Sequence, residues 1–458
     1  MGVEDNGAGS PACGSFVPMT RDEILALCEE RDIKFIRFWF TDVLGQLKSF
    51  AVTREELPTA MESGMGFDGS SITGFNAIEE SDMIAMPDLD TFAVLPYRPT
   101  EQGVARVFCD IQLPTGEPYE GDPRQILRRA IERARSMGFD HYYLGPELEF
   151  FYFKSSEGTE TLDRGGYFDL TTLDAASDLR RETVLALEAM GIHVEYSHHE
   201  VAPSQHEIDM RFDDALRMAD NVMTYRTVVK EVAHRHGVYA TFMPKPLANE
   251  NGSGMHTHQS LFRGESNAFF DPSDEYLLSA DAKAFIAGQL RHARELSCVF
   301  AQWVNSYKRL VPGYEAPVYI AWSRRNRSAL IRVPMYHVGK ERATRCELRS
   351  PDPACNPYLT FAALLHAGLD GIEKGYELPA PMETNLYEFG PEERAREGIE
   401  SLPETLGEAI EIGAASELLL RAFGEHTHSR FVEIKRAEWE EYRVQLTPFE
   451  MERYLPVL

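Results

Sequence analysis

Two glutamates stand two positions apart in a strongly apolar run. The segment YLGPELEFFYF (143–153) contains Glu147 and Glu149, and its aromatic and aliphatic residues predict a buried strand. Because side chains alternate between the two faces of a strand, both carboxylates would point the same way. Two like charges in an apolar setting repel each other and are costly to desolvate. The arrangement therefore needs a compensating partner from elsewhere in the chain or from a ligand.

A second pair of glutamates occurs in HVEYSHHEVAPSQHEIDMRF (193–212). If Pro203 and Ser204 form a two-residue turn between two strands, Glu200 and Glu207 become direct cross-strand partners, about 5 Å apart at Cβ. Like charges in that position destabilise a sheet unless a cation lies between them. Taken alone, the pair is better interpreted as two solvated glutamates at the edge of a hairpin.

Two further segments place polar side chains on one face of a strand. These side chains are His256, His258 and Ser260 in NGSGMHTHQSLF, and Arg345, Glu347 and Arg349 in RCELRS. Histidines two positions apart are more often structural than metal ligands. An acid between two bases is most often part of a surface ion-pair ladder. Neither segment by itself distinguishes chemistry from packing.

A basic segment interrupts this acidic chain. NSYKRLVPGYEAPVYIAWSRRNRSALIR (305–332) carries six cations around the loop VPGYEAP, which holds Glu315. The cations are Lys308, Arg309, Arg324, Arg325, Arg327 and Arg332. Basic side chains beside a mobile loop suit a polyphosphate or carboxylate substrate under a lid. A solubilising patch or an oligomer interface would have the same composition.

Together these segments offer five glutamates and one histidine on predicted strands. Carboxylate oxygens with a single imidazole suit Mg²⁺ or Mn²⁺ better than zinc. Clustered arginines add the groups that neutralise charge during phosphoryl transfer. The sequence contains no GxxxxGK[ST] loop and no GxGxxG motif that opens a helix, so a nucleotide would need another kind of pocket.

The elements that must position these residues follow from local pattern. The amphipathic segment MTRDEILALCEERD predicts a helix capped by Thr20, and two strands follow around a turn at 42–45. A second helix is predicted between a cap at Asp122 and a stop at Gly138. The fold class is α+β. The predicted organisation is a flexible tail at 1–18, a small domain at 19–115 and a large domain at 116–458.

Composition excludes several classes of function. The chain has 458 residues and a net charge of −27, which disfavours nucleic acids and anionic membranes as partners. No run is long enough to span a bilayer, and the first residues have no secretory pattern. The six cysteines are scattered without a CxxC motif. They indicate free thiols in a reducing compartment, so we expect a cytoplasmic protein.

Six segments follow one another along the chain: FDGSSITGF, GPELEFF, SHHEVAPSQHEID, NGSGMHTHQSLF, KRLVPGYEAPVYIAWSRRNRSALIR and CELRSPDPACNPYLTFAALLHAG. In this order they closely resemble the signature motifs of bacterial type I glutamine synthetase. The resemblance runs from about residue 20 to the C-terminus. It implies an N-terminal β-grasp domain and a catalytic domain with a curved antiparallel sheet. It also implies a homo-oligomer, a dodecamer of two hexameric rings, with active sites between neighbouring subunits.

The resemblance assigns a role to each motif residue. One metal site would be held by Glu149, Glu200 and Glu207, and the other by Glu147, His256 and Glu347. Glutamate would be gripped by Asn251, Gly252, Arg309 and Arg349. ATP would contact His258, Ser260, Arg332 and Arg345, with Arg327 near the transferred phosphate. Glu315 matches the lid residue, and Asp68, Ser71 and Tyr167 would complete the ammonium pocket with Glu200 and Glu315.

The implied activity is the ligation of ammonia to the γ-carboxylate of L-glutamate. A carboxylate is a poor target for ammonia, so ATP first converts it to γ-glutamyl phosphate. Ammonium must lose a proton before it attacks, and Asp68 is the expected base. The acyl phosphate would hydrolyse in water, which explains a lid over the site.

Two other activities stay open at this point. Some relatives join glutamate to amines or polyamines, and they often lack the aspartate and serine that Asp68 and Ser71 match. A non-catalytic family member is a further alternative. Regulation is also open: Tyr387 stands where some relatives are adenylylated, and Ala77 stands where others carry an arginine used for feedback by glutamine.

Overall fold

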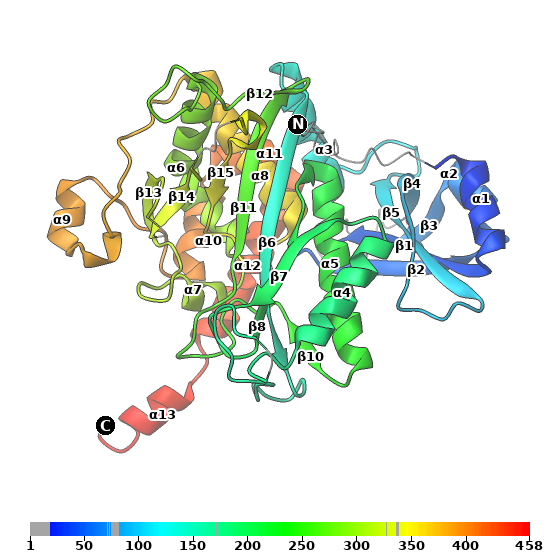
Figure 1. The fold of residues 1–458 in the computed structure, drawn as a ribbon, viewed down its shortest axis with the longest axis horizontal. Helices are drawn as coiled ribbons and strands as arrows, with labels where there is room; N and C mark the ends of the chain where they lie inside the picture. Colours follow the sequence, from blue (N-terminus) through cyan, green and yellow to red (C-terminus); the bar gives the residue numbers. More distant parts are fainter. Residues whose placement is uncertain are drawn as a thin grey trace, which may run out of the picture.

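The computed structural model describes residues 19–70, 72, 74, 82–170, 172–326, 328–335 and 339–458. The chain forms two separate β-sheets, a five-stranded sheet near the N-terminus and a ten-stranded sheet in the rest of the molecule (Figure 1). The predicted tail and three singled-out residues lie outside the described residues: Ser71, Ala77 and Arg327. None of the described helices is both long and apolar enough to cross a membrane.

The smaller sheet contains mixed strand pairings. Its elements are α1 (Arg21–Glu30), β1 (Ile33–Thr41), β2 (Leu47–Thr53), α2 (Leu57–Ser63), β3 (Met65–Asp68), β4 (Asp82–Val94) and β5 (Gly103–Gln112). The strand order is β2-β1-β5-β4-β3, with β1 and β5 parallel. Ile24 of α1 packs with Ile36, Phe38 and Val107 in a core of its own. This α+β arrangement agrees with the small mixed domain expected at this end.

Local sequence signals account for the ends of these elements. The Thr20 hydroxyl and the Glu23 carboxylate form the reciprocal hydrogen bonds of a capping box at the start of α1. Between β1 and β2, Asp42 Oδ1 accepts hydrogen bonds from the N–H groups of Leu44 (3.0 Å) and Gln46 (2.8 Å). Gly45 has a φ of 79°, a conformation that glycine adopts without strain. The predicted cap and turn are confirmed.

The larger part of the chain is built around a long central strand. Its strands are β6 (His141–Phe153), β7 (Val194–His199), β8 (Gln205–Met210), β9 (Asp213–Asp214), β10 (Tyr239–Thr241), β11 (Met255–Arg263), β12 (Ser266–Asn267), β13 (Tyr319–Ser323), β14 (Ala329–Arg332) and β15 (Cys346–Leu348). The main order is β13-β14-β15-β11-β6-β8-β7, and every pair in it except β13–β14 is antiparallel.

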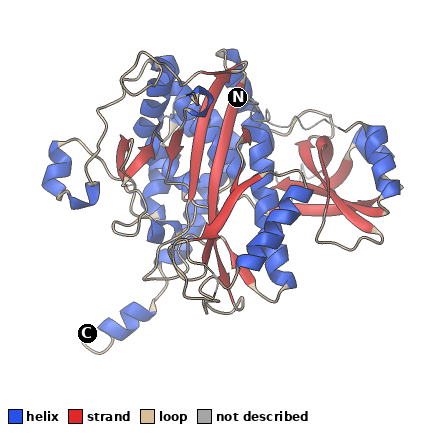
Figure 2. Ribbon diagram, in the orientation of Figure 1, coloured by secondary structure: helices blue, strands red, loops and turns tan. Residues whose placement is uncertain are grey.

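The helices of the larger part mostly cover one face of this sheet, but the short helices Pro391–Arg396 and Pro448–Tyr454 project away from it (Figure 1 and Figure 2). The helices of this part are α3 (Pro123–Ser136), α4 (Ser177–Ala189), α5 (Ala215–Arg235), α6 (Ala280–Phe300), α7 (Ser306–Arg309), α8 (Pro357–Lys374), α9 (Pro391–Arg396), α10 (Leu406–Ala414), α11 (Glu417–Phe423), α12 (Glu425–Arg443) and α13 (Pro448–Tyr454), with short 3₁₀ turns at Glu341–Ala343 and Leu386–Glu388. Leu148 and Phe150 of β6 are fully buried on this side. Their neighbours Glu147 and Glu149 therefore face the other side of the sheet.

Helix α3 joins the two parts of the molecule. Asp122 caps it by accepting a hydrogen bond from the N–H of Arg124 (3.0 Å), as predicted. The Arg124 guanidinium pairs with Asp88 (2.7 Å) and Asp110 (2.6 Å) of the small sheet and with Asp220 (2.9 Å) of α5. One buried cation thus connects strands β4 and β5 to a helix of the larger part.

Candidate active site

A line of polar side chains crosses the open face of the larger sheet. In the register of β6, Glu147 lies opposite Asp209 of β8 on one side and opposite His256 of β11 on the other. Glu149 lies opposite Glu207 of β8. Residues directly opposite in adjacent strands share a face, so three strands bring these carboxylates and the imidazole together. The predicted strand and the shared face of Glu147 and Glu149 are confirmed.

The first cluster is formed by Glu147, His256 and Glu347. One ligand atom from each lies within 4.8 Å of the others. His256 Nδ1 is 3.5 Å from Glu147 Oε2 and 3.9 Å from Glu347 Oε1. Burial, followed by the charge of Arg349, lowers the pKa of His256 to about 4. The imidazole is therefore neutral at pH 7, and two carboxylates with one neutral imidazole suit a divalent cation that prefers oxygen.

A hydrogen-bond chain orients the first cluster from the side of β15. Arg345 Nε donates to His258 Nδ1 at 3.1 Å. Because an arginine can only donate, the proton of a neutral His258 must be on Nε2. That Nε2 donates to Glu147 Oε1 at 2.8 Å. Burial would raise the pKa of Glu147, but the His258 charge and the hydrogen bonds from His256 and His258 hold it well below its ordinary value.

Glu347 is the buried member of this cluster. It is fully buried, Oε1 accepts a hydrogen bond from Arg349 at 2.6 Å, and Oε2 accepts one from Arg332 Nε. Burial would raise its pKa, but the charges of His258, Arg349 and His256 lower it to about 2. A carboxylate that stays ionised in the interior can serve as a permanent anionic ligand.

The second cluster lies at the β7–β8 hairpin, and here the predicted register is wrong. Glu207 lies opposite His198, and the Glu200 backbone bonds to Gln205, so Glu200 and Glu207 are diagonal neighbours. The loop is longer than a two-residue turn. Ser204 takes a left-handed φ of 61°, and its N–H donates to Asp163 at 2.8 Å. This anchor outside the hairpin sets the register, and the hairpin sequence does not reveal it.

The carboxylates of the second cluster still gather on one face. Ligand atoms of His198, Glu200 and Glu207 lie within 4.8 Å of one another, and His198 Nε2 is 2.8 Å from Glu200 Oε1. Glu149 adjoins them through its pairing with Glu207, and its Oε2 accepts hydrogen bonds from the Gly254 N–H (2.9 Å) and Gln205 Nε2 (3.1 Å). The structure thus adds a histidine to the three predicted glutamates.

Electrostatic repulsion dominates this second cluster. Burial, followed by the charge of Glu200, raises the pKa of Glu149 to about 8. Burial, followed by the charges of Asp209 and Glu149, raises the pKa of Glu207 well above its ordinary value. Protons therefore compete with any metal ion here, whereas the first cluster keeps its carboxylates ionised.

A small pocket of about 30 Å³ lies between the second cluster and the basic segment. Glu149, Glu200 and His256 line it together with the predicted lid residue Glu315 and the residues predicted to hold the substrate glutamate: Asn251, Gly252, Arg309 and Arg349. The structure brings these predicted residues together from four separate segments of the chain. Anionic metal ligands on one wall and two guanidinium-bearing residues on another suit a small molecule that carries both a carboxylate and a metal-binding group.

Two of these residues are fixed by close contacts. Arg309 Nη1 and Nη2 donate to the carbonyl oxygens of Ser350 (2.8 Å) and Arg349 (3.0 Å). A Cβ on Gly252 would lie 2.4 Å from the Pro244 carbonyl oxygen and 3.0 Å from Arg309 Cγ. Position 252 therefore requires glycine, and its loop is packed tightly against the residues behind it.

The loop that carries Glu315 closes one side of the pocket. Glu315 has a left-handed φ of 58°, an uncommon conformation for a residue with a side chain. The Tyr387 hydroxyl donates to the carbonyl oxygen of the next residue, Ala316, at 2.7 Å. Tyr387 thus holds the backbone of the Glu315 loop, a contact that would act as a latch if this loop is the predicted lid.

A further cavity of about 170 Å³ lies on the other side of the first cluster. Its lining is largely apolar, with Leu277, Val333 and Pro334, and Arg345 joins it to His258 and the first cluster. Ser260 follows His258 by two positions on β11 and is buried, while Arg332 pairs with Glu347. An apolar cavity beside cations and metal ligands suits the base of a nucleotide.

The comparisons with known proteins agree along nearly the whole chain. The family model "Glutamine synthetase, beta-Grasp domain" matches residues 32–114, and "Glutamine synthetase, catalytic domain" matches residues 120–454. The chain belongs to the glutamine synthetase family. Its larger sheet is thus the catalytic domain and its smaller sheet the β-grasp domain of that family.

Individual glutamine synthetases are similar over nearly their full length. The Mycolicibacterium smegmatis glutamine synthetase is 54% identical over 441 residues, which cover 95% of this chain and 99% of the relative. The Thermotoga maritima glutamine synthetase is 51% identical, with coverages of 95% and 100%. Among solved structures, Plasmodium falciparum glutamine synthetase superposes with a TM-score of 0.86 at 26% identity, covering 96% of this chain and 99% of that one. GmaS in complex with ADP has a TM-score of 0.86 at 32% identity, covering 94% and 99%.

Among the residues predicted for the ammonium pocket, Asp68 lies away from the rest of this site, whereas Tyr167 lies beside His198 of the second cluster. Asp68 ends β3 in the β-grasp sheet, where its Oδ1 accepts a hydrogen bond from the Ser70 N–H at 2.8 Å. No described residue of that sheet lines the small pocket. Tyr167 is 47% exposed and stacks on Phe168, with its ring 5.5 Å from His198. Ser71 and Arg327 fall outside the described residues.

Sequence reasoning missed three polar residues of the site. His198 and Asp209 lie two positions before Glu200 and two positions after Glu207, so the alternation of a strand could have identified both. Burial, followed by the charge of Glu147, raises the pKa of Asp209 to about 6. Gln205 donates a hydrogen bond to Glu149. This contact depends on the observed register of the hairpin, so the predicted register could not reveal it.

Proposed function

We propose that this chain catalyses the ATP-dependent ligation of ammonia to the γ-carboxylate of L-glutamate, giving L-glutamine, ADP and phosphate. Family membership over nearly the whole chain supports this proposal. The observation that carries it is the juxtaposition of two metal-ligand clusters with a carboxylate-sized pocket on one side and an apolar, cation-lined cavity on the other. This spatial order, with the metal-ligand clusters between the two cavities, matches a reaction in which a phosphoryl group passes from a nucleotide to a carboxylate.

The two clusters fit Mg²⁺ or Mn²⁺. Glu147, His256 and Glu347 would hold one ion, and Glu149, Glu200 and Glu207, with His198 beside them, would hold the other. Their donors are mainly carboxylate oxygens, which favours these hard cations over zinc. When bound, such ions neutralise phosphate charge and position the substrate carboxylate.

The chain's own residues would orient the reactants. Asn251, Gly252, Arg309 and Arg349 would contact the amino acid, and His258, Ser260, Arg332 and Arg345 would contact ATP. Arg327 is proposed to face the transferred phosphate. Guanidinium groups placed at that point offset the negative charge that spreads over the phosphoryl oxygens. The Glu315 lid would exclude water, because water would otherwise hydrolyse γ-glutamyl phosphate.

The acceptor pocket is proposed to be shared between subunits. Asp68 and Ser71 of one chain would meet Tyr167, Glu200 and Glu315 of its neighbour, with Asp68 taking a proton from ammonium. The position of Asp68 in the β-grasp sheet supports this arrangement, since the residues lining the pocket of its own chain come from other elements. We propose the dodecamer of two hexameric rings as the active form. We place the reaction in the cytoplasm, where the buried free thiols of the described cysteines stay reduced.

The experiment that tests the proposal supplies the acceptor separately. Purified full-length protein receives L-glutamate, ATP and Mg²⁺ with either ammonium or a panel of primary amines, and both phosphate and amide product are measured. We expect phosphate release that depends on ammonium and matches glutamine formation. Activity with amines alone would overturn the proposed acceptor. The absence of release with every acceptor would overturn catalysis itself.

A further inference from the structure

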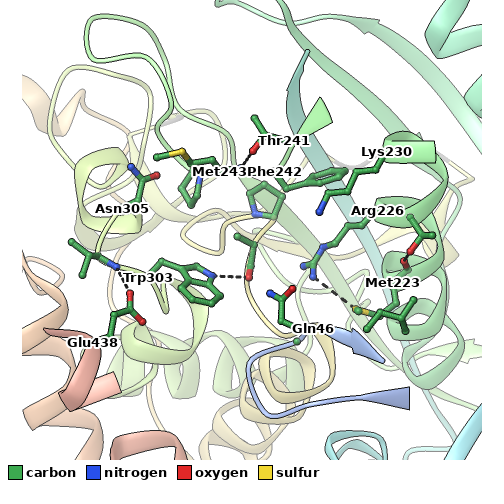
Figure 3. Close-up of a pocket in the computed structure, with 17 residues that line it drawn as sticks. Gln46, Met223, Arg226, Lys230, Thr241, Phe242, Met243, Trp303, Asn305 and Glu438 are labelled. Carbon is green, nitrogen blue, oxygen red and sulfur yellow. Dashed lines mark hydrogen bonds between the residues drawn. The ribbon is translucent and has the colours of Figure 1, made fainter. Parts of the chain in front are cut away.

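A cavity of about 610 Å³ lies where the β-grasp sheet meets the catalytic domain (Figure 3). Its walls come from the β1–β2 turn, from α5, from the segment after β10 and from the residues before α7. Its lining shares no residue with either cavity of the proposed active site. It is therefore a separate space with its own chemistry.

Two cations without a carboxylate partner stand on one side of this cavity. Arg226 and Lys230 are one helical turn apart on α5 and lie beside each other, across from Trp303 and Glu438 (Figure 3). Arg226 donates to the Cys355 carbonyl oxygen at 2.6 Å, and the Lys230 ammonium lies 5.7 Å from the centre of the Phe242 ring. Among the described residues, no carboxylate forms an ion pair with either cation. Arg226 is buried and Lys230 is exposed, and two adjacent cations at the edge of a cavity attract an anion.

The acidic residue of the cavity does not offset them. Glu438 Oε2 accepts a hydrogen bond from Lys435 at 2.7 Å, and Oε1 accepts one from the Val304 N–H at 3.2 Å. Glu231, the neighbour of Lys230 in sequence, is paired with Arg98. Both carboxylates already have cationic partners. The buried Asp352 interacts electrostatically with Arg309 as well as with Arg226, so it offsets the two cations of the cavity only in part.

The rest of the lining is partly apolar and aromatic. Met223, Phe242, Met243, Pro244 and Trp303 form its apolar part, and polar side chains such as Gln46, Thr227 and Thr241 stand among them. We propose that this interdomain cavity binds a small organic anion, with its carboxylate or phosphate head at Arg226 and Lys230 and its apolar body against Trp303 and Phe242. Such a site is what a ligand with one charged end and one apolar end requires.

The back wall of the cavity also supports the loop that carries Asn251 and Gly252, the residues proposed to contact glutamate. Pro244 lines the cavity, and its carbonyl oxygen accepts a hydrogen bond from the Ser253 N–H at 2.8 Å. The same oxygen is the atom that a Cβ on Gly252 would meet at 2.4 Å. Asn305 lines the cavity too, exchanges hydrogen bonds with the Lys245 backbone (2.8 and 3.0 Å), and directly precedes the helix α7 that ends at Arg309.

A ligand in the cavity therefore touches the supports of both Gly252 and Arg309. Tightly packed contacts transmit displacement because the interior has no free space to absorb it. Occupancy of the cavity changes glutamate affinity, and by reciprocity glutamate changes the affinity for the anion. This coupling rests on the proposed glutamate site, whereas the binding of an anion does not.

Calorimetry on the full-length assembly tests the binding. The probes are phenylacetate, phenyl phosphate and the uncharged phenylacetamide, so that the better anion identifies the head group. We expect saturable binding of at least one anion, with phenylacetamide at least tenfold weaker. Lys230→Met should weaken anion binding at least tenfold, and the control Lys154→Met, at a surface lysine paired with Glu160, should leave it unchanged. Equal binding of anion and amide, or unchanged binding by Lys230→Met, would overturn the site.

The coupling is tested by titrating glutamate with and without the bound anion. We expect at least a threefold change in glutamate affinity in the unmodified protein and none in Lys230→Met. Anion binding that leaves glutamate affinity unchanged would overturn the coupling. Because both titrations record heat of binding and no turnover, a failure here is distinguishable from an absence of ligase activity.

Discussion

Glu147 and His258 are joined by a hydrogen bond of 2.8 Å whose direction is fixed by a third residue. Arg345 donates to the far nitrogen of the ring, so the near nitrogen must carry the proton that Glu147 accepts. One oxygen of Glu147 is thereby committed to His258, and the other is left to face His256. The carboxylate is held in one orientation before any ligand arrives, which is what a metal ligand near a nucleotide requires.

Removing the charge of Glu147 should therefore abolish turnover without unfolding the protein. We expect Glu147→Gln to lower the rate at least about a thousandfold, because the first cluster loses an anionic ligand. Calorimetry with Mn²⁺ should show one fewer ion per chain. The control Glu265→Gln removes an exposed carboxylate that pairs with Arg342, away from both clusters. An unaltered Mn²⁺ count in Glu147→Gln would contradict the assignment.

The metal-free protein should lose stability as the pH rises from 4.5 to about 8. Glu149 and Glu207 have raised pKa values in the folded state. Their protonation stabilises the fold below the unfolded pKa of 4.5, and this contribution is lost as the pH rises through about 8 for Glu149. The lowered pKa values of Glu147 and Glu347 change the stability of the fold only below pH 4.5. They therefore do not contribute to the loss of stability at higher pH.

Added Mg²⁺ should offset this loss, so its stabilising effect should be larger at pH 8.5 than at pH 6. Each unit of pKa difference is worth about 1.4 kcal/mol. Thermal unfolding at both pH values, with and without Mg²⁺, measures the difference. The paired comparison cancels the contribution of Asp122, a buried carboxyl with a pKa of about 7 that lies outside the site. Glu149→Gln should flatten the dependence, and equal Mg²⁺ effects at both pH values would refute the argument.

The latch at Tyr387 should govern how well the lid excludes water. Tyr387→Phe removes the hydrogen bond to the Ala316 carbonyl, a loss of about 1 kcal/mol. We expect glutamate to bind several-fold more weakly and more phosphate to be released per glutamine formed. Tyr239→Phe is a matched control, since Tyr239 is 44% exposed on β10. A phosphate-to-glutamine ratio that stays at the unmodified value would show that the latch does not act on the lid.

Arg124 should contribute strongly to holding the two domains together. Its side chain is 4% exposed and pairs with Asp88, Asp110 and Asp220. Arg124→Gln leaves three carboxylates without this shared cation, and removing one partner of a buried pair costs about 3–5 kcal/mol. Chemical denaturation measures the loss. Arg135→Gln, in the same helix but 55% exposed and paired with Glu132, should change stability by less than about 0.5 kcal/mol.

The sequence predicted those features that depend on neighbours along the chain. The caps at Thr20 and Asp122 and the common face of Glu147 and Glu149 follow from local geometry, and the structure confirms them. The hairpin register did not follow, because Asp163, about forty positions away in the chain, holds Ser204 in a left-handed conformation. Long-range contacts of this kind, like the Arg345–His258–Glu147 chain and the interdomain cavity, arise only when distant segments pack together.

If the acceptor pocket is shared between subunits as proposed, with Asp68 and Glu147 of one site coming from different chains, the active site is a property of pairs of chains. A chain with Asp68→Asn and a chain with Glu147→Gln would each assemble into an inactive protein. Co-assembled in equal amounts, they would restore about a quarter of the sites, because half of the chains supply an intact metal cluster and half of their neighbours an intact aspartate. A single damaged gene copy would likewise impair its partners' sites as well as its own.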